Sequence, residues 1–212
     1  MTIEIIVPFE DRLKVVEMGA VVKKQPYYNV PENLDVEAFK HWKRSKLRKT
    51  IKGEDRNFGK NWLYVDLVPS SCWYTNVRSN VDAVDWERIK QMSRVRANDV
   101  CELCGARADF KRRNFMECHE RFHYDETTKI QKLVRFVCLC TDCHHVTHFG
   151  LSQLQGRGEK AFNHLMAVNK WDEARTTQHI NKRFHQWEQK SAMSWELDLS
   201  MLEGLLKTED VI

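Results

Sequence analysis

The pattern of apolar and polar positions divides the chain into a short N-terminal unit and a longer remainder. Ile3 to Val7 is an apolar, β-branched run, which is typical of a strand. Asp11 to Met18 is expected to be a helix, and Val21 to Val30 an extended segment. Apolar residues at helical spacing predict a second helix over Asp35 to Leu47. Residues 1–47 are therefore expected to form a small β-α module.

A polar, basic stretch separates this module from the rest of the chain. Residues 48–60 contain two glycines, and we interpret them as a basic linker. The elements expected in residues 61–212 are an extended segment to Tyr74, a helix from Asp82 or Asp85 to Ala97, strands at 114–119 and 133–139 joined by a polar loop, helices near 142, at 159–169 and at 172–189, and a last strand at 195–199. The predicted fold class is α+β, with helices surrounding the two central strands.

Four of the seven cysteines stand in two close pairs, Cys101-x-x-Cys104 and Cys140-x-x-Cys143. Four thiolates at this paired spacing can close a tetrahedron around one Zn²⁺. An odd cysteine count with close pairs fits zinc in a reducing compartment better than a secreted disulfide framework. We therefore expect a structural zinc site in a cytoplasmic protein.

Two histidines follow the second cysteine pair and indicate another metal. His144 and His148 are four residues apart, so on a helix they share one face and could bind a second ion. One of them could instead join the zinc set in place of a cysteine. Five of the nine histidines fall between positions 119 and 148. A closed zinc knuckle beside an open histidine site favours a nuclease over a plain zinc finger.

The charge distribution adds a basic segment to this picture. The net charge is only +4, but residues 40–60 carry nine basic side chains against two acidic ones. Such a stretch can neutralise phosphates, although a solvated helix end and linker is an equal interpretation. The chain has no run of about 18 apolar residues, and its first residues have no basic signal region. We expect neither a membrane span nor a signal peptide.

The order of motifs over residues 101–150 is cysteine pair, strand with histidine, strand, cysteine pair, and helix bearing His-x-x-x-His. This order resembles the HNH endonucleases, the ββα-metal or His-Me finger group, in their zinc-stapled form. CTDCHHVTH at 140–148 matches the last part of the family pattern. The resemblance implies metal-dependent hydrolysis of phosphodiester bonds in DNA. It implies that His144 and His148 bind the catalytic metal (Mg²⁺, Mn²⁺ or Zn²⁺), that His119 is the general base, and that the cysteines hold structural zinc.

Two positions differ from the family pattern. Cys118 stands where the family has an aspartate or histidine ligand, and Arg135 stands where it has an asparagine. The segment Glu117-Cys118-His119-Glu120 can be aligned in two registers. In one, His119 is the base; in the other, His119 is a metal ligand and Glu120 takes the base position. The sequence leaves both registers open.

The N-terminal segment resembles a small domain of unknown function that accompanies DNA-processing proteins of conjugative elements. The matching residues are Met18-Gly19-Ala20, Tyr27-Tyr28, Val30-Pro31 and Phe39-x-x-Trp42. This resemblance implies a nucleic-acid context.

The first functional hypothesis is therefore an HNH-type nuclease in a bacterial or phage-infected cell. Phosphate contacts are expected from five basic residues, Arg94, Arg96, Arg112, Arg113 and Arg135. Nucleases that break both strands often work as paired sites, so a homodimer is one option. The alternative is a catalytically inactive zinc module that binds nucleic acid or a partner protein, as a phage or plasmid adaptor or inhibitor.

Overall fold

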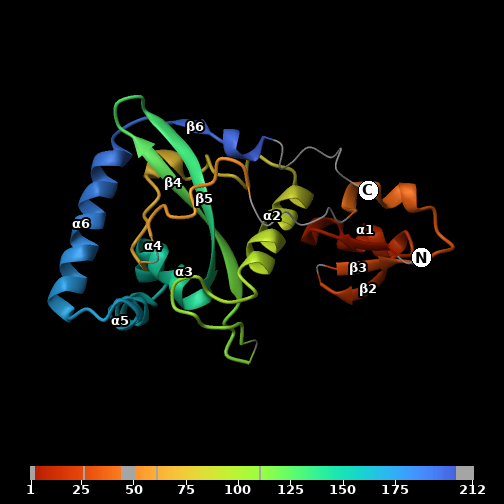
Figure 1. Ribbon diagram of the computed structural model, residues 1–212, viewed down its shortest axis with the longest axis horizontal. Coiled ribbons are helices and arrows are strands. Elements are labelled where there is room, and N and C mark those ends of the chain that lie inside the picture. The colour runs from red at the N-terminus through yellow and green to blue at the C-terminus, as the bar shows by residue number, and fades with distance from the viewer. Residues whose placement is uncertain (1–2, 26, 44–50, 61, 110, 204–212) are drawn as a thin grey trace.

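The computed structural model describes residues 3–25, 27–43, 51–60, 62–109 and 111–203. The fold is mixed α+β, which confirms the predicted class, with two three-stranded sheets in separate parts of the molecule (Figure 1). Within the described residues, none of the helices has both the length and the apolar character needed to cross a membrane.

The N-terminal sheet is antiparallel in the order β1-β3-β2. Its elements are β1 (Ile3–Ile6), η1 (Phe9–Asp11), α1 (Arg12–Glu17), β2 (Val21–Lys24), β3 (Tyr27–Val30) and η2 (Val36–Trp42). The extended segment expected over 21–30 is thus a hairpin. The helix expected over 35–47 is a 3-10 helix in its described part, and positions 44–47 lie outside the described residues.

The core of this module contains Tyr28, Phe39 and Trp42, which are all nearly fully buried. The apolar stripe that predicted the second helix therefore does face a core. Val84 of the following helix belongs to the same cluster. The module consequently packs on that helix, and Arg88 reinforces the contact by donating a hydrogen bond of 2.6 Å to the carbonyl of residue 43.

The second sheet is built on a long antiparallel hairpin, β4 (Met116–Asp125) and β5 (Ile130–Cys140), with β6 (Glu196–Asp198) parallel to β5. Both hairpin strands are longer than expected. Most of the predicted polar loop is paired, including His123 with Lys132, and only the residues between Asp125 and Ile130 form the turn. A register shift after Arg121 leaves Val134 unpaired with β4.

Helices flank this hairpin on both sides (Figure 1). They are α2 (Ala83–Arg96), α3 (Thr141–Thr147), α4 (Phe149–Leu154), α5 (Gly158–Asn169) and α6 (Glu173–Ser191), with single 3-10 turns η3 (Ser70–Cys72) and η4 (Ser200–Leu202). Asp82 caps α2 and Asp172 caps α6, as each accepts a backbone N–H of the first turn. α2 covers one side of the hairpin, and α3 to α6 cover the other.

Residues 51–60 and 62–69 run along the hairpin, and neither of these described stretches forms a strand. Residues 48–50 of the expected linker lie outside the described residues. Residues 51–60 are packed rather than extended in solvent, because Ile51 is buried and the Asp55 N–H donates to Val134 O at 2.9 Å. The register shift in the hairpin therefore supplies the carbonyl that holds this segment.

Candidate metal centres

The four paired cysteines meet at one point of the structure. Cys101 and Cys104 lie in the loop after α2, Cys140 ends β5, and Cys143 lies in the first turn of α3. Their sulfur atoms all lie within 4.8 Å of one another, so this set could hold a metal ion such as zinc. The geometry agrees with the sequence prediction of a thiolate site.

Backbone hydrogen bonds fold the first pair into a tight knuckle. Gly105 N–H donates to Cys101 O at 3.0 Å, and Cys101 N–H donates to Ala106 O at 2.8 Å. Gly105 has φ of 75°, a conformation that glycine adopts without strain. A contact that the sequence did not indicate comes from α5, where His164 Nε2 lies 3.2 Å from Cys143 Sγ.

Three histidines form a second cluster beside the cysteines. His119 comes from β4, and His144 and His148 come from α3 and its C-terminal cap. One ligand atom from each ring lies within 4.8 Å of the other two, so the set could hold a metal ion. Burial lowers the pKa of His119, against the opposing effect of Asp66, and burial also lowers the pKa of His148. Both imidazoles are therefore neutral near pH 7, which is the form that binds metals.

Two carboxylates lie next to ring nitrogens of this cluster. Asp66 Oδ2 lies 3.4 Å from His119 Nε2, and Glu117 Oε2 lies 2.9 Å from His144 Nδ1. Burial raises the pKa of each carboxyl, but the neighbouring histidine outweighs it and the net pKa is lowered in both. Metal-binding histidines commonly donate their second ring nitrogen to such a carboxylate, which fixes the ring and its tautomer.

Asp66 is held in place by the elements on either side of it. Its backbone N–H donates to Thr147 O of α3 at 2.9 Å, and the preceding Val65 N–H donates to His179 Nε2 of α6 at 3.2 Å. The sequence analysis did not single out Asp66, because it lies in an extended segment far along the chain from the histidines.

The opposite face of β4 carries Cys118 and Glu120, since neighbouring side chains on a strand point to opposite faces. Glu120 Oε1 accepts the Val77 N–H at 2.8 Å, and burial raises the pKa of this carboxyl. Burial also raises the pKa of the Cys118 thiol to about 12. The structure thus brings His119 to the cluster but places Glu120 and Cys118 on the other side of the strand.

Two of the arginines expected to contact phosphate lie inside the protein. Arg96 is paired with Glu54 through two hydrogen bonds of 2.7 and 2.9 Å, and its side chain is 5% exposed. Arg135, 2% exposed, pairs with Glu102 at 2.9 Å and donates to the carbonyl oxygens of Phe58 and Lys60. A phosphate on the surface could not reach either guanidinium without displacing these partners. Their long-range carboxylates were not predictable from the local sequence.

The other three predicted phosphate contacts lie nearer the surface. Arg94 is partly exposed and paired with Asp99 at 2.8 Å. Arg112 and Arg113 are exposed in the loop between the knuckle and β4. The structure therefore does not gather the five predicted arginines on one surface.

Arg135 instead positions the segment that carries Asp66. Its cross-strand partner is Arg121, which also donates to Phe58 O and lies 4.5 Å from the centre of the Tyr64 ring. A Cβ at Gly59 would come within 2.6 Å of the Tyr64 hydroxyl, so only glycine fits there, with φ of 71°. These buried contacts fix the path of the chain toward the histidine cluster.

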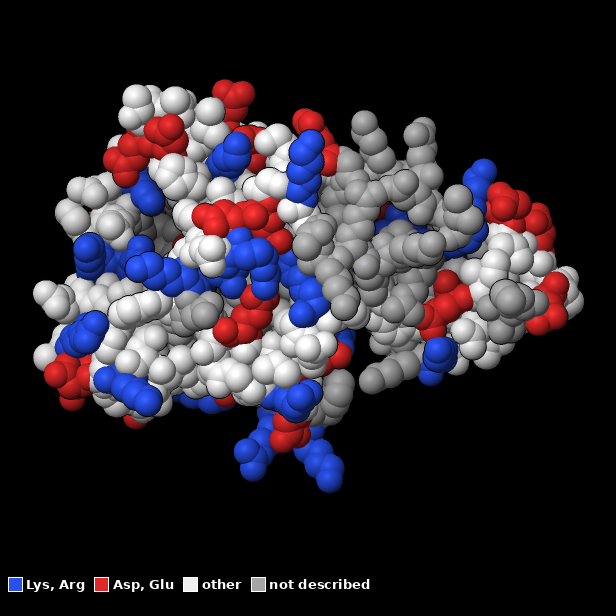
Figure 2. All heavy atoms as spheres, viewed as in Figure 1, with Lys and Arg blue, Asp and Glu red and all other residues white. Residues whose placement is uncertain are grey.

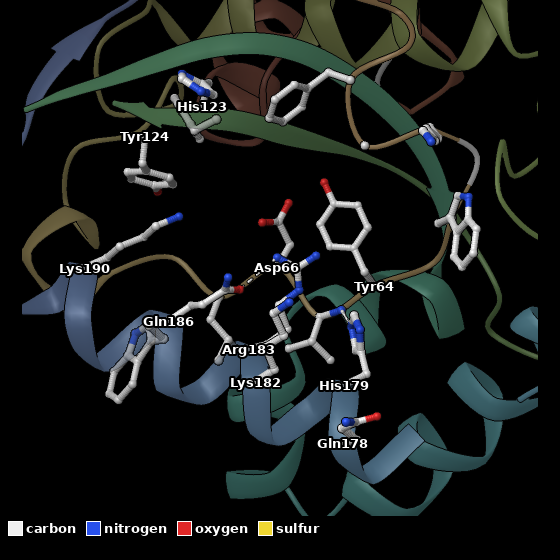
Figure 3. A pocket seen from close by; sticks show the side chains of 18 of the residues that line it. Tyr64, Asp66, His123, Tyr124, Gln178, His179, Lys182, Arg183, Gln186 and Lys190 are labelled. Atoms are coloured by element: carbon white, nitrogen blue, oxygen red, sulfur yellow. Dashed lines mark hydrogen bonds between the residues drawn. The ribbon is translucent and has the colours of Figure 1, made fainter. Parts of the chain in front are cut away.

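A cleft of about 1090 Å³ lies beside the cluster, between α6 and the segment that carries Tyr64 and Asp66 (Figure 3). Asp66 connects the cleft with the histidine cluster, because it lines the cleft and its carboxylate lies 3.4 Å from His119 Nε2. Lys190 and Tyr124 lie at one end. The helical pattern predicted α6, but nothing in the sequence indicated that its basic residues line one side of a cleft.

Comparison with protein-family models, with curated proteins and with solved structures finds no match for this chain. The geometry of the two clusters and the cleft is therefore what indicates a function for this protein.

Proposed function

We propose that the protein is a metal-dependent hydrolase of phosphodiester bonds in nucleic acid, built on a ββα-metal finger formed by β4, β5 and α3. The observation that carries this proposal is the meeting of His119 with His144 and His148, backed by Asp66 and Glu117. In this proposal the cysteine cluster next to it holds structural zinc. The resemblance to the HNH endonucleases favours DNA as the substrate.

The donor set fits a transition metal in an open site. Catalytic zinc sites use three protein ligands and leave a position for water or substrate, whereas structural sites use four. Imidazole favours Zn²⁺ and similar ions, while Mg²⁺ prefers oxygen ligands. An ion bound there would polarise a phosphoryl oxygen and make water more acidic.

In this proposal His119 is the third ligand rather than a separate base. Its ring centre lies 5.0 Å from that of His148 and 5.6 Å from that of His144. Asp66 orients His119, and Glu117 orients His144. Arg121 and Arg135 do not contact the histidines. They are positioning residues, because both donate hydrogen bonds to the segment that leads to Asp66.

The test measures both metal content and cleavage. The wild type, His119→Ala and His148→Ala are compared, and His145→Ala is the matched control because His145 lies on the same helix outside the cluster. Supercoiled plasmid and oligonucleotide are supplied with Mg²⁺, Mn²⁺, Ni²⁺ or Zn²⁺. We expect two metal ions per wild-type chain, cleavage with a transition metal, and loss of one ion and of cleavage in both cluster variants but not in the control.

Other outcomes identify what is wrong with the proposal. If His119→Ala keeps both ions but loses cleavage, His119 is a base and not a ligand. If the folded wild type cleaves nothing with any ion, the hydrolase proposal fails. The inactive zinc module that binds nucleic acid or a protein would then be the better interpretation.

A further inference from the structure

The cleft beside Asp66 has two unlike sides. One face of α6 contributes Arg175, Lys182 and Lys190, at spacings that place them along one side of the helix. Across from them lie aromatic side chains of the segment before Asp66 and of the hairpin, including Trp62, Tyr64 and Tyr124. Figure 3 shows Arg183 and Lys190 of α6 directed toward the same space as Tyr64 and Tyr124.

The basic side chains of the cleft outnumber its two carboxylates, Asp55 and Asp66. The cleft is lined by five basic side chains, Lys60, Arg175, Lys182, Arg183 and Lys190. Among the described residues none of the five lies within salt-bridge distance of a carboxylate, although Asp66 is near enough to interact with the charges of Arg183 and Lys190. Arg183 lies 4.8 Å from the Tyr64 ring centre and Lys190 lies 4.8 Å from that of Tyr124, contacts that neutralise no charge. Figure 2 shows basic side chains grouped across the face between α6 and the hairpin.

Aromatic surface at the cleft is available for stacking. Trp62 is 47% exposed, and its ring centre lies 6.1 Å from that of Trp171, which also lines the cleft. A positive groove that follows the backbone, combined with aromatic rings that stack on bases, is the usual design of sites for single-stranded nucleic acid.

The size of the cleft favours one strand over two. Its volume of about 1090 Å³ is close to that of sites for drug-sized ligands, roughly 300–1,000 Å³. A few nucleotides of one strand fit such a space. A duplex of the same length would have to place a second strand in that volume. The basic face from Arg175 to Lys190 is about 22 Å long at about 1.5 Å per residue.

We propose that this cleft binds a single-stranded segment of nucleic acid, with phosphates along the basic face of α6 and bases against Trp62 and Trp171. Asp66 lies in the cleft and contacts His119, so a bound strand passes next to the histidine cluster. The inference deepens the proposed function by naming its substrate class, and it relies on that function only for the cleavage of the strand.

Binding is measured by fluorescence anisotropy on the full-length chain carrying His148→Ala, so that the probes stay intact. The probes are oligo-dT and oligo-U of about 12 nucleotides, a length within the usual site size of about 4–16, and a duplex of the same length. The cleft variant is Lys182→Gln/Lys190→Gln. The matched control is Lys111→Gln/Lys129→Gln, which removes the same charge from two exposed positions outside the cleft.

We expect the single strands to bind at least tenfold more tightly than the duplex. The cleft variant should lose at least tenfold in affinity and reduce the salt slope by about 1.4, at about 0.7 per lost phosphate contact on a single strand. Trp62→Ala should lose about tenfold with the slope unchanged, because stacking involves no counterions. The control should bind as the parent does, and the preference between oligo-dT and oligo-U identifies the sugar.

Three results would overturn the inference: preference for duplex, equal losses in the cleft variant and the control, or no binding to any probe. These results are distinct from failure of the hydrolase proposal. Tight cleft-dependent binding by a wild type that cleaves nothing would leave the cleft assignment standing and remove the catalytic one.

Discussion

The cysteine and histidine clusters share one short helix but differ in almost every other property. Cys143 and His144 are consecutive residues of α3, separated by about 100° around the helix axis, and they belong to different clusters. The cysteine set has four donors and three of its members are essentially buried. The histidine set has three donors, with Asp66 and Glu117 behind it and a cleft at its edge.

This difference indicates a division of work within the hairpin and α3. A closed set of four thiolates stabilises a fold when it binds zinc, because the unfolded chain has no such site. A set of three imidazoles leaves one coordination position open, which the proposed function assigns to water or substrate. The predictions below test this division, beginning with the largest effect.

Loss of the cysteine site should unfold this part of the protein. Zinc binding contributes an apparent 10–16 kcal/mol or so in zinc-finger peptides, which exceeds the roughly 5–15 kcal/mol stability of a typical domain. Cys104→Ser/Cys143→Ser should therefore lose zinc and its cooperative thermal transition by circular dichroism. His144→Ala/His148→Ala should keep that transition. A cysteine variant that melts like the wild type would contradict the assignment of the two clusters.

Loss of Arg135 should have the next largest effect, although this residue binds no metal. Arg135→Met removes one of the two arginines paired with Glu102, the other being Arg56, and takes a buried donor from the carbonyl oxygens of Phe58 and Lys60. Loss of a buried hydrogen-bond partner costs about 1–3 kcal/mol, measurable as a lower urea midpoint. The control, Arg112→Met, removes an exposed arginine and should change stability by less than about 0.5 kcal/mol. Equal effects of the two variants would show that Arg135 does not stabilise the fold through buried contacts, and would favour the phosphate-contacting role expected from the sequence.

The sequence predicted the elements whose signals are local. The cysteine spacing led to the four-sulfur cluster, capping aspartates led to α2 and α6, and helical spacing led to the core face that contains Phe39 and Trp42. It did not predict the length of the hairpin, because the polar residues of its distal half contain no strong strand signal. Pairing of His123 with Lys132 extends both strands despite that polarity.

The parts of the site that the sequence missed depend on contacts between distant residues. Asp66 meets His119, and Arg135 meets Glu102, only after the chain has folded. The local pattern around Arg96 and Arg135 suggested surface cations, since nothing nearby in sequence indicates the carboxylates that bury them. The cleft forms because α6 faces a segment more than a hundred residues earlier in the chain. The Trp187 Nε1–H of α6, for example, donates a hydrogen bond of 3.0 Å to Val68 O of that segment.

The carboxylate behind His119 should tune metal binding without supporting the fold. Asp66→Asn removes the charge that orients His119, and loss of such a partner usually weakens metal binding by about 10–100-fold. Competition with a chromophoric chelator would measure the affinity of the histidine site while the cysteine site stays filled. Glu120→Gln is the control, because Glu120 lies on the other face of β4. An equal loss in both variants would show that the effect does not come through the histidine cluster.

A histidine outside both clusters gives the smallest effect and the clearest pH dependence. Burial, aided by Arg183 and Lys182, lowers the pKa of His179 to about 4, and its Nε2 accepts the Val65 N–H only when neutral. The unfolded chain binds this proton below about pH 6.5, whereas the folded chain resists it until about pH 4. Stability should therefore decline as pH falls from about 6.5 to 4, by about 1 kcal/mol once partial exposure and solvent screening are considered. Urea unfolding of the wild type and His179→Gln across this range measures the difference, since glutamine can accept the same hydrogen bond without titrating. Parallel pH curves would mean that His179 takes up its proton equally in the folded and the unfolded chain, and that α6 is not joined to the Asp66 segment through a neutral imidazole.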